Sequence, residues 1–135
     1  MKVALSVWGE RISPVFDTAA SVLVVTLDGA QETGRSTEPL RETFPPRRAA
    51  RLVELGVDVL ICGAVSRPLA SMIASYGIEL VPFVSGEAEE VLAAWLSGGL
   101  RAPGVPRRFQ MPGCYGMRRR FRGRGQKRWR TGGRL

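Results

Sequence analysis

The residues whose types are best suited to binding or chemistry lie in one turn in the middle of the chain. Residues 57–62 are a nearly continuous apolar run ending in Cys62, and Gly63-Ala64-Val65-Ser66-Arg67-Pro68 follows. In open α/β sheets, ligands bind beyond the carboxyl ends of strands, and the free N–H groups at a helix start favour an anion. The turn is therefore a candidate anion site built from Cys62, Gly63, Ser66 and Arg67. In the alternative, structural interpretation, Gly63 turns the chain, Ser66 caps a helix and Cys62 is a small buried apolar residue.

A second candidate is the segment from Arg11 to Asp17, which follows the first predicted strand. Pro14 disfavours helical backbone at Ser13, so the segment is expected to be a loop near the same end of the sheet. There, Ser13 could donate a hydrogen bond to a ligand and Arg11 could pair with its charge. The alternative is a plain connection, with Phe16 packed on the core.

The chain has two cysteines and no histidine. Cys114 stands between Met111 and Met117, and cysteine and methionine are soft metal ligands. Cys62 and Cys114 are thus the candidate metal ligands, although their spacing is not that of a CxxC site. The alternative for the segment around Cys114 is an uncommitted linker.

The absence of histidine also bears on catalysis. It removes the commonest general base and every Ser-His or Cys-His nucleophile arrangement. A nuclease would need several carboxylates converging on divalent metal ions, but the first predicted strand, residues 2–8, carries no acid. We therefore expect a protein that holds a ligand and is not an enzyme.

Hydrophobic periodicity predicts a single α/β domain over residues 1–97. Asp28-Gly29 is a hairpin signal, so the first three strands should be antiparallel, whereas later strands separated by helices should be parallel. The segment 57–62 should lie inside this mixed sheet, and the polar segment 31–38 at its edge. The expected strands are 2–8, 21–27, 31–38, 57–62 and 78–84, and the expected helices begin near residues 45, 67 and 86.

Residues 98–135 form a Gly- and Arg-rich basic tail, which we expect to be mostly disordered when free. From Arg101 onward there are eleven Arg, one Lys and no acid, so the tail carries +12 and residues 1–100 carry −4. Phe109 and Met111 could fold back over the sheet, which would move the boundary to about residue 115.

The aromatic residues interleaved with arginines in this tail resemble those of RNA-binding Arg-Gly segments. The alternative function is therefore a nucleic-acid-associated adaptor that binds RNA or DNA through Arg118, Arg119, Arg120, Arg122, Arg124, Lys127, Arg128 and Trp129. The simpler interpretation is weak, unselective polyanion binding.

No apolar run approaches the length of a membrane span, and the first eight residues are too short and too alternating for a signal peptide. Two cysteines are too few for a disulfide-stapled secreted module. We therefore expect no membrane association and a cytoplasmic location. The sequence does not indicate an oligomeric state.

Three segments together resemble the dinitrogenase iron–molybdenum cofactor biosynthesis family. They are Ser13-Pro14-Val15-Phe16-Asp17, Leu55-Gly56-Val57-Asp58-Val59-Leu60-Ile61-Cys62-Gly63 and Gly86-Glu87-Ala88-Glu89-Glu90-Val91-Leu92. The resemblance covers about residues 1–97, and the segment from Met111 to Cys114 and the tail resemble one subgroup. Members include carriers of the nitrogenase cofactor and its precursor, and the orange protein, which holds a molybdenum–copper sulfide cluster.

This resemblance implies a ribonuclease H-like three-layer α/β/α fold with a five-stranded mixed sheet in the order β-β-β-α-β-α-β-α. It also implies a carrier for an anionic iron–molybdenum or molybdenum-type metal–sulfur cluster, with cluster donor and acceptor proteins as partners. Some carriers in the family use histidine as a cluster ligand. This chain has no histidine, so the cluster would instead be held by Cys thiolate, by Arg and Lys charge or by backbone N–H groups.

Overall fold

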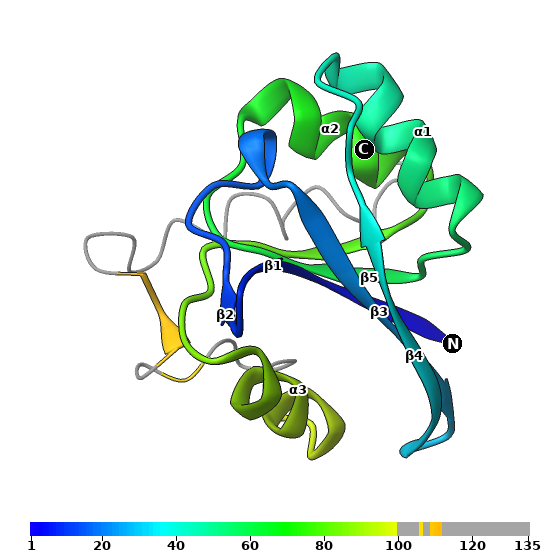
Figure 1. The fold of residues 1–135 in the computed structure, drawn as a ribbon, viewed down its shortest axis with the longest axis vertical. Coiled ribbons are helices and arrows are strands. Elements are labelled where there is room, and N and C mark those ends of the chain that lie inside the picture. Colours follow the sequence, from blue (N-terminus) through cyan, green and yellow to red (C-terminus); the bar gives the residue numbers. More distant parts are fainter. Residues whose placement is uncertain (100–105, 107–108, 112–135) are drawn as a thin grey trace, which may run out of the picture.

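The computed structural model describes residues 1–99, 106 and 109–111 of the 135-residue chain (Figure 1). Its helices and strands follow one another in the predicted order, with two short additional elements, β2 and η1, near the N-terminus. The elements are β1 (Lys2–Trp8), β2 (Arg11–Ile12), the 3-10 helix η1 (Phe16–Thr18), β3 (Ser21–Asp28), β4 (Gln31–Pro39), α1 (Pro45–Glu54), β5 (Val59–Ile61), α2 (Arg67–Ser75), β6 (Glu79–Val81) and α3 (Ala88–Leu96).

The strands form one mixed sheet in the order β4-β3-β1-β5-β6, with β2 paired to β1. β3 is antiparallel to β1 and to β4, whereas β5 is parallel to β1 and to β6. The predicted mixed sheet is confirmed, with the polar strand β4 at one edge and β5 in the interior. Val59 and Ile61 are 1% and 0% exposed, as expected of a strand covered on both faces.

The described part of the sheet has six strands, and the prediction of five was wrong. Residues 11 and 12 were expected to lie in a loop, but Trp8 pairs with Arg11 and Val7 with Ile12. The chain reverses at once because Gly9 adopts a left-handed φ of +65°, which a glycine tolerates without steric cost. β5 and β6 are also shorter than predicted.

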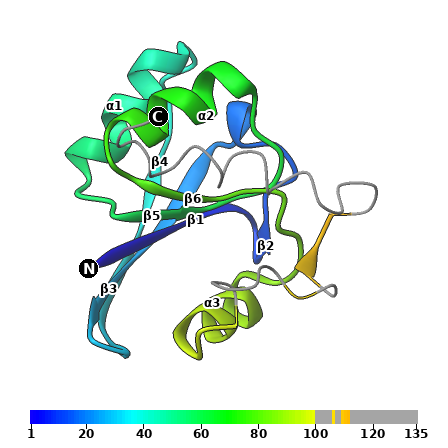
Figure 2. The ribbon, with the colours of Figure 1, turned by 180° about the vertical axis from the view of Figure 1, so that it is seen from behind.

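The two faces of the sheet bury separate cores, because side chains alternate along β1. Val3, Leu5 and Val7 pack with apolar residues of α3, whereas Ala4 packs with those of α1 and α2. Figures 1 and 2 show α3 on one side of the sheet and α1 with α2 on the other. The domain therefore has three layers, with helices on both faces.

A short segment beyond α3 returns to the sheet. Phe109 is 2% exposed in the core on the α3 side, and Gln110 forms an antiparallel bridge with Val84. The Phe109 carbonyl accepts the Ser85 N–H at 2.7 Å, and the Met111 N–H donates to the Phe83 carbonyl at 3.1 Å. This is the fold-back that Phe109 and Met111 suggested. The predictions for Cys114 and for the basic residues 118–130 lie outside the described residues.

Candidate functional site

Three loops meet at the edge of the sheet formed by the carboxyl ends of β1, β5 and β6. They are residues 9–17, 62–66 and 82–87, and backbone hydrogen bonds join each to its neighbour. The Ala64 N–H donates to the Pro14 carbonyl at 2.8 Å, and the Phe83 N–H donates to the Gly63 carbonyl at 2.9 Å. The Ile12 N–H donates to the Gly86 carbonyl at 2.9 Å. We call this joined surface the carboxyl edge.

Gly63 and Ser13, two of the predicted site residues, are brought together. A Cβ on Gly63 would lie 2.5 Å from the Pro14 carbonyl oxygen and closer still to that of Ser13. The glycine therefore permits the first loop to cross directly over the second. Ser13 is itself buried, and its hydroxyl donates to the Val15 carbonyl at 3.3 Å, so it serves the loop in this structure.

The start of α2 is occupied by a carboxylate from the first loop. Oδ1 of Asp17 accepts the Ser66 N–H at 2.8 Å. Ser66 is the N-cap residue of α2, as the alternative interpretation expected, but its hydroxyl makes no capping hydrogen bond. Asp17 is the residue that sequence reasoning missed. Asp17 belongs to the segment 13–17 that carries part of the family resemblance, but its hydrogen-bond partner, Ser66, lies 49 positions away along the chain.

Cys62 lies wholly inside the core on the α1 and α2 side. Burial raises the pKa of its thiol well above the usual value, and the nearby Asp17 charge adds to this shift. A protonated, inaccessible thiol is a poor metal ligand. In the part of the chain that the structure describes, no three His, Cys, Asp or Glu side chains are grouped as metal ligands. The geometry thus disfavours direct coordination through Cys62.

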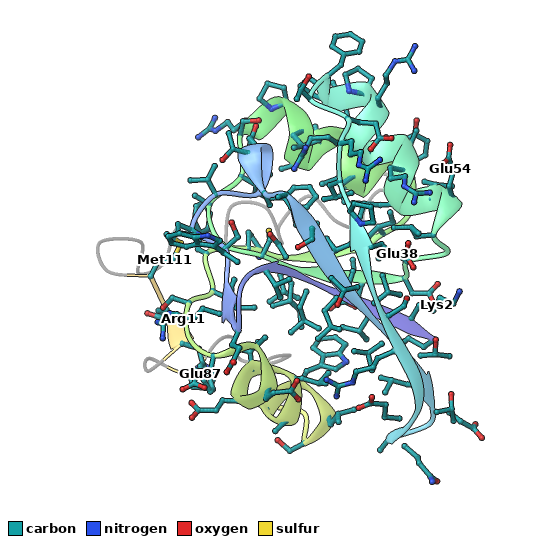
Figure 3. The ribbon with its side chains drawn as sticks, in the orientation of Figure 1. Lys2, Arg11, Glu38, Glu54, Glu87 and Met111 are labelled. Carbon is teal, nitrogen blue, oxygen red and sulfur yellow. The ribbon has the colours of Figure 1, made fainter. Side chains whose placement is uncertain are left out.

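Arg11 and Arg67 are exposed, and neither forms an ion pair within the described residues. They are not brought together. Arg67 is the first residue of α2, whereas the backbone of Arg11 pairs with Glu87, just before α3 on the other face. Figure 3 shows Arg11, Glu87 and Met111 on the same side of the molecule. Trp8, which pairs with Arg11, is 73% exposed.

The family model described as dinitrogenase iron–molybdenum cofactor matches residues 1–98. Among solved structures, the crystal structure of PH0822 has a TM-score of 0.68 at 18% identity, covering 73% of this chain and 92% of that one. A Methanocaldococcus jannaschii protein, provisionally named a dinitrogenase, has a TM-score of 0.60 at 23% identity, covering 78% and 97%. A Thermotoga protein, provisionally named a NifB protein, has a TM-score of 0.59 at 20% identity, covering 73% and 89%. No curated protein matches significantly. At these identities, the structural likeness supports the fold alone.

No described helix is long and apolar enough to cross a membrane.

Proposed function

Because the chain belongs to the dinitrogenase iron–molybdenum cofactor family, we propose that it binds an anionic metal–sulfur cluster, or a molybdenum–sulfur precursor of one, as cargo. Its role is to hold the cluster between a donor and an acceptor protein in the cytoplasm, without catalysing a reaction on it. The sheet order, with a polar antiparallel edge and parallel inner strands, supports assignment to the ribonuclease H-like folds.

The observation that carries the proposed location is the joining of three loops at the carboxyl edge. Loops beyond parallel strands are where α/β sheets bind ligands. Arg67 and Arg11 border this edge and have no acidic partner among the described residues, so their donors are available to an anion. Family membership is thus the ground for the proposed ligand class, and the joined loops are the ground for the proposed location.

The residues present fit a pre-assembled cluster better than a bare metal ion. A bare ion needs several converging protein ligands, and none are grouped in the described part of the chain. A cluster that carries its own sulfides needs hydrogen-bond donors and positive charge instead. Buried Cys62 does not serve as a ligand in this proposal; Cys114, outside the described residues, keeps its predicted role as a possible thiolate ligand.

The proposal can be tested with tetrathiomolybdate, a molybdenum–sulfur dianion. Anaerobic equilibrium dialysis of the full chain, with molybdenum measured on both sides, gives the affinity. We expect Arg67→Gln and Arg11→Gln each to weaken binding about three- to tenfold at low salt, because each removes a positive charge that borders the edge and attracts the dianion. Arg47→Gln, which changes an exposed arginine on α1, is the matched control and should bind normally.

Two results would separate the parts of the proposal. If the protein binds tetrathiomolybdate no more tightly than it binds sulfate, the proposed ligand class is wrong. If it binds but both variants behave like Arg47→Gln, the location is wrong.

The charge of the tail favours a second candidate, the nucleic-acid adaptor. Twelve basic residues without an acid after position 100 would bind a polyanion in a salt-dependent manner. A chain ending after Met117, which keeps Cys114 but lacks residues 118–135, should lose RNA binding yet keep tetrathiomolybdate binding. RNA binding that survives this truncation would contradict a tail-based adaptor.

A further inference from the structure

Arg48 on α1 is an unusual residue, because its charged side chain is 2% exposed. Its neighbour Arg47 is exposed, as arginines on a helix surface usually are. No carboxylate of the described residues lies within ion-pair distance of Arg48. Burial lowers the pKa of Arg48, whereas the charges of Asp17 and Glu42 act in the opposite direction. A buried charge is retained only where hydrogen bonds replace its hydration.

Backbone carbonyls supply those hydrogen bonds. One terminal nitrogen, Nη2, donates to the Phe16 carbonyl at 2.9 Å and also to the Ala19 carbonyl. The other, Nη1, donates to the Glu42 carbonyl at 2.6 Å. The guanidinium also lies 5.3 Å from the centre of the Phe16 ring, within cation–π range. Arg48 therefore binds the carbonyls at both ends of the turn formed by η1.

That turn carries the carboxylate that occupies the start of α2. Asp17 lies between Phe16 and Ala19, and its Oδ1 accepts the Ser66 N–H at 2.8 Å. The Phe16 N–H also donates to the Ala64 carbonyl at 2.7 Å, so the turn is held on both sides. We propose that Arg48 is the positioning residue that holds the η1 turn in place and thereby sets the Asp17 carboxylate against the Ser66 N–H at the carboxyl edge.

Amide hydrogen exchange of the full chain, followed by NMR, tests this assignment without any ligand. Arg48→Gln should lower the protection of the Ser66 amide about fivefold relative to the β1 amides, since a lost capping contact has about that effect. Asp17→Ala should give the same relative loss, and the double variant should lose no more than either single variant. Arg47→Gln is the matched control and should leave the ratio of Ser66 protection to β1 protection unchanged.

The ratio separates positioning from a purely structural role. A variant that only weakens the whole fold lowers the protection of β1 and Ser66 together, because both then exchange through global unfolding. If Arg48→Gln does not fold, Arg48→Lys, which keeps the charge but offers a single donor nitrogen, should show an intermediate loss. An unchanged ratio in the folded variant, or additive losses in the double variant, would overturn the inference.

A second readout rests on the proposed function. Asp17→Asn should strengthen tetrathiomolybdate binding in the wild-type background and have less effect in the Arg48→Gln background, where the carboxylate is no longer held at the edge. Equal effects in both backgrounds would overturn the coupling. A wild-type protein that does not bind tetrathiomolybdate would instead overturn the proposed function, while the exchange experiment would still decide the role of Arg48.

Discussion

Replacing Gly63 with alanine should destabilise the domain strongly, although it adds only one methyl group. The added Cβ would lie 2.5 Å from the Pro14 carbonyl oxygen and 2.8 Å from the Pro14 carbonyl carbon. These atoms belong to the backbone and cannot rotate away. A tolerable carbon–oxygen contact is about 3.3 Å or longer, so the first loop would have to move by roughly 0.8 Å to clear the Pro14 oxygen and slightly more to clear the Ser13 oxygen.

The magnitude follows from what this movement disrupts. Forcing a methyl group into a closed site costs about 1–3 kcal/mol. The hydrogen bonds from Ala64 to Pro14 and from Phe16 to Ala64, 2.8 and 2.7 Å long, both cross the displaced contact. Each contributes about 1 kcal/mol. We therefore expect the free energy of unfolding to fall by about 4 kcal/mol, which lowers the Tm of a domain this size by roughly 15–30 °C.

Urea unfolding and thermal melting, both followed by circular dichroism, measure this loss. The matched control is Gly34→Ala, since a Cβ on Gly34 meets no atom within 4 Å. It should change the free energy of unfolding by less than about 0.5 kcal/mol. A loss below about 1 kcal/mol for Gly63→Ala would refute the argument that only glycine fits beneath the first loop.

Three further predictions follow from other contacts. Phe109→Ala should cost about 3 kcal/mol, and a chain ending after Gly99 should melt like this variant, while one ending after Met111 should match the full chain by calorimetry. Asp17→Asn should tighten tetrathiomolybdate binding about two- to fivefold in dialysis, because it removes a negative charge but keeps an acceptor for the Ser66 N–H; weaker binding would contradict this. Because burial raises the pKa of Cys62, the folded protein binds the thiol proton more tightly than the unfolded chain does. The contribution of this thiol to the free energy of unfolding is fully present below the ordinary pKa of 9.0 and should be lost above it, by up to about 1.4 kcal/mol per pH unit. Urea titrations at several pH values measure this loss, and Cys62→Ala should lack it.

The sequence predicted the fold where a local pattern decides it. The alternation of residues 3–7 and the apolar run 57–62 both depend on burial, which hydrophobicity reports directly. The β2 strand was missed because its two residues pair across a turn too short to leave a periodic signal. Phe109 was uncertain for a similar reason, since one apolar residue among arginines and prolines does not define a face.

The candidate site was harder to predict because its contacts join residues that are distant in the sequence. Gly63 and Ser13 were both selected, but nothing in their types shows that one backbone crosses directly over the other. Asp17 and Ser66 meet only after the sheet has formed. Composition also cannot separate Arg48, which is buried, from Arg47, which is exposed, because adjacent arginines on a helix differ only in the direction they face.

The parallel pairing of β1 with β5 has a consequence for the order in which the molecule folds. Strands β1, β3 and β4 can pair as a local meander, whereas the contact between Val3 and Val59 must close a loop of more than fifty residues. Closing such a loop costs about 3–4 kcal/mol of chain entropy. During synthesis from the N-terminus, the carboxyl edge can assemble only after residues 82–87 have emerged, and Phe109 can pack only later still. A nascent chain therefore acquires the β1-β3-β4 meander early and completes the carboxyl edge among its last steps.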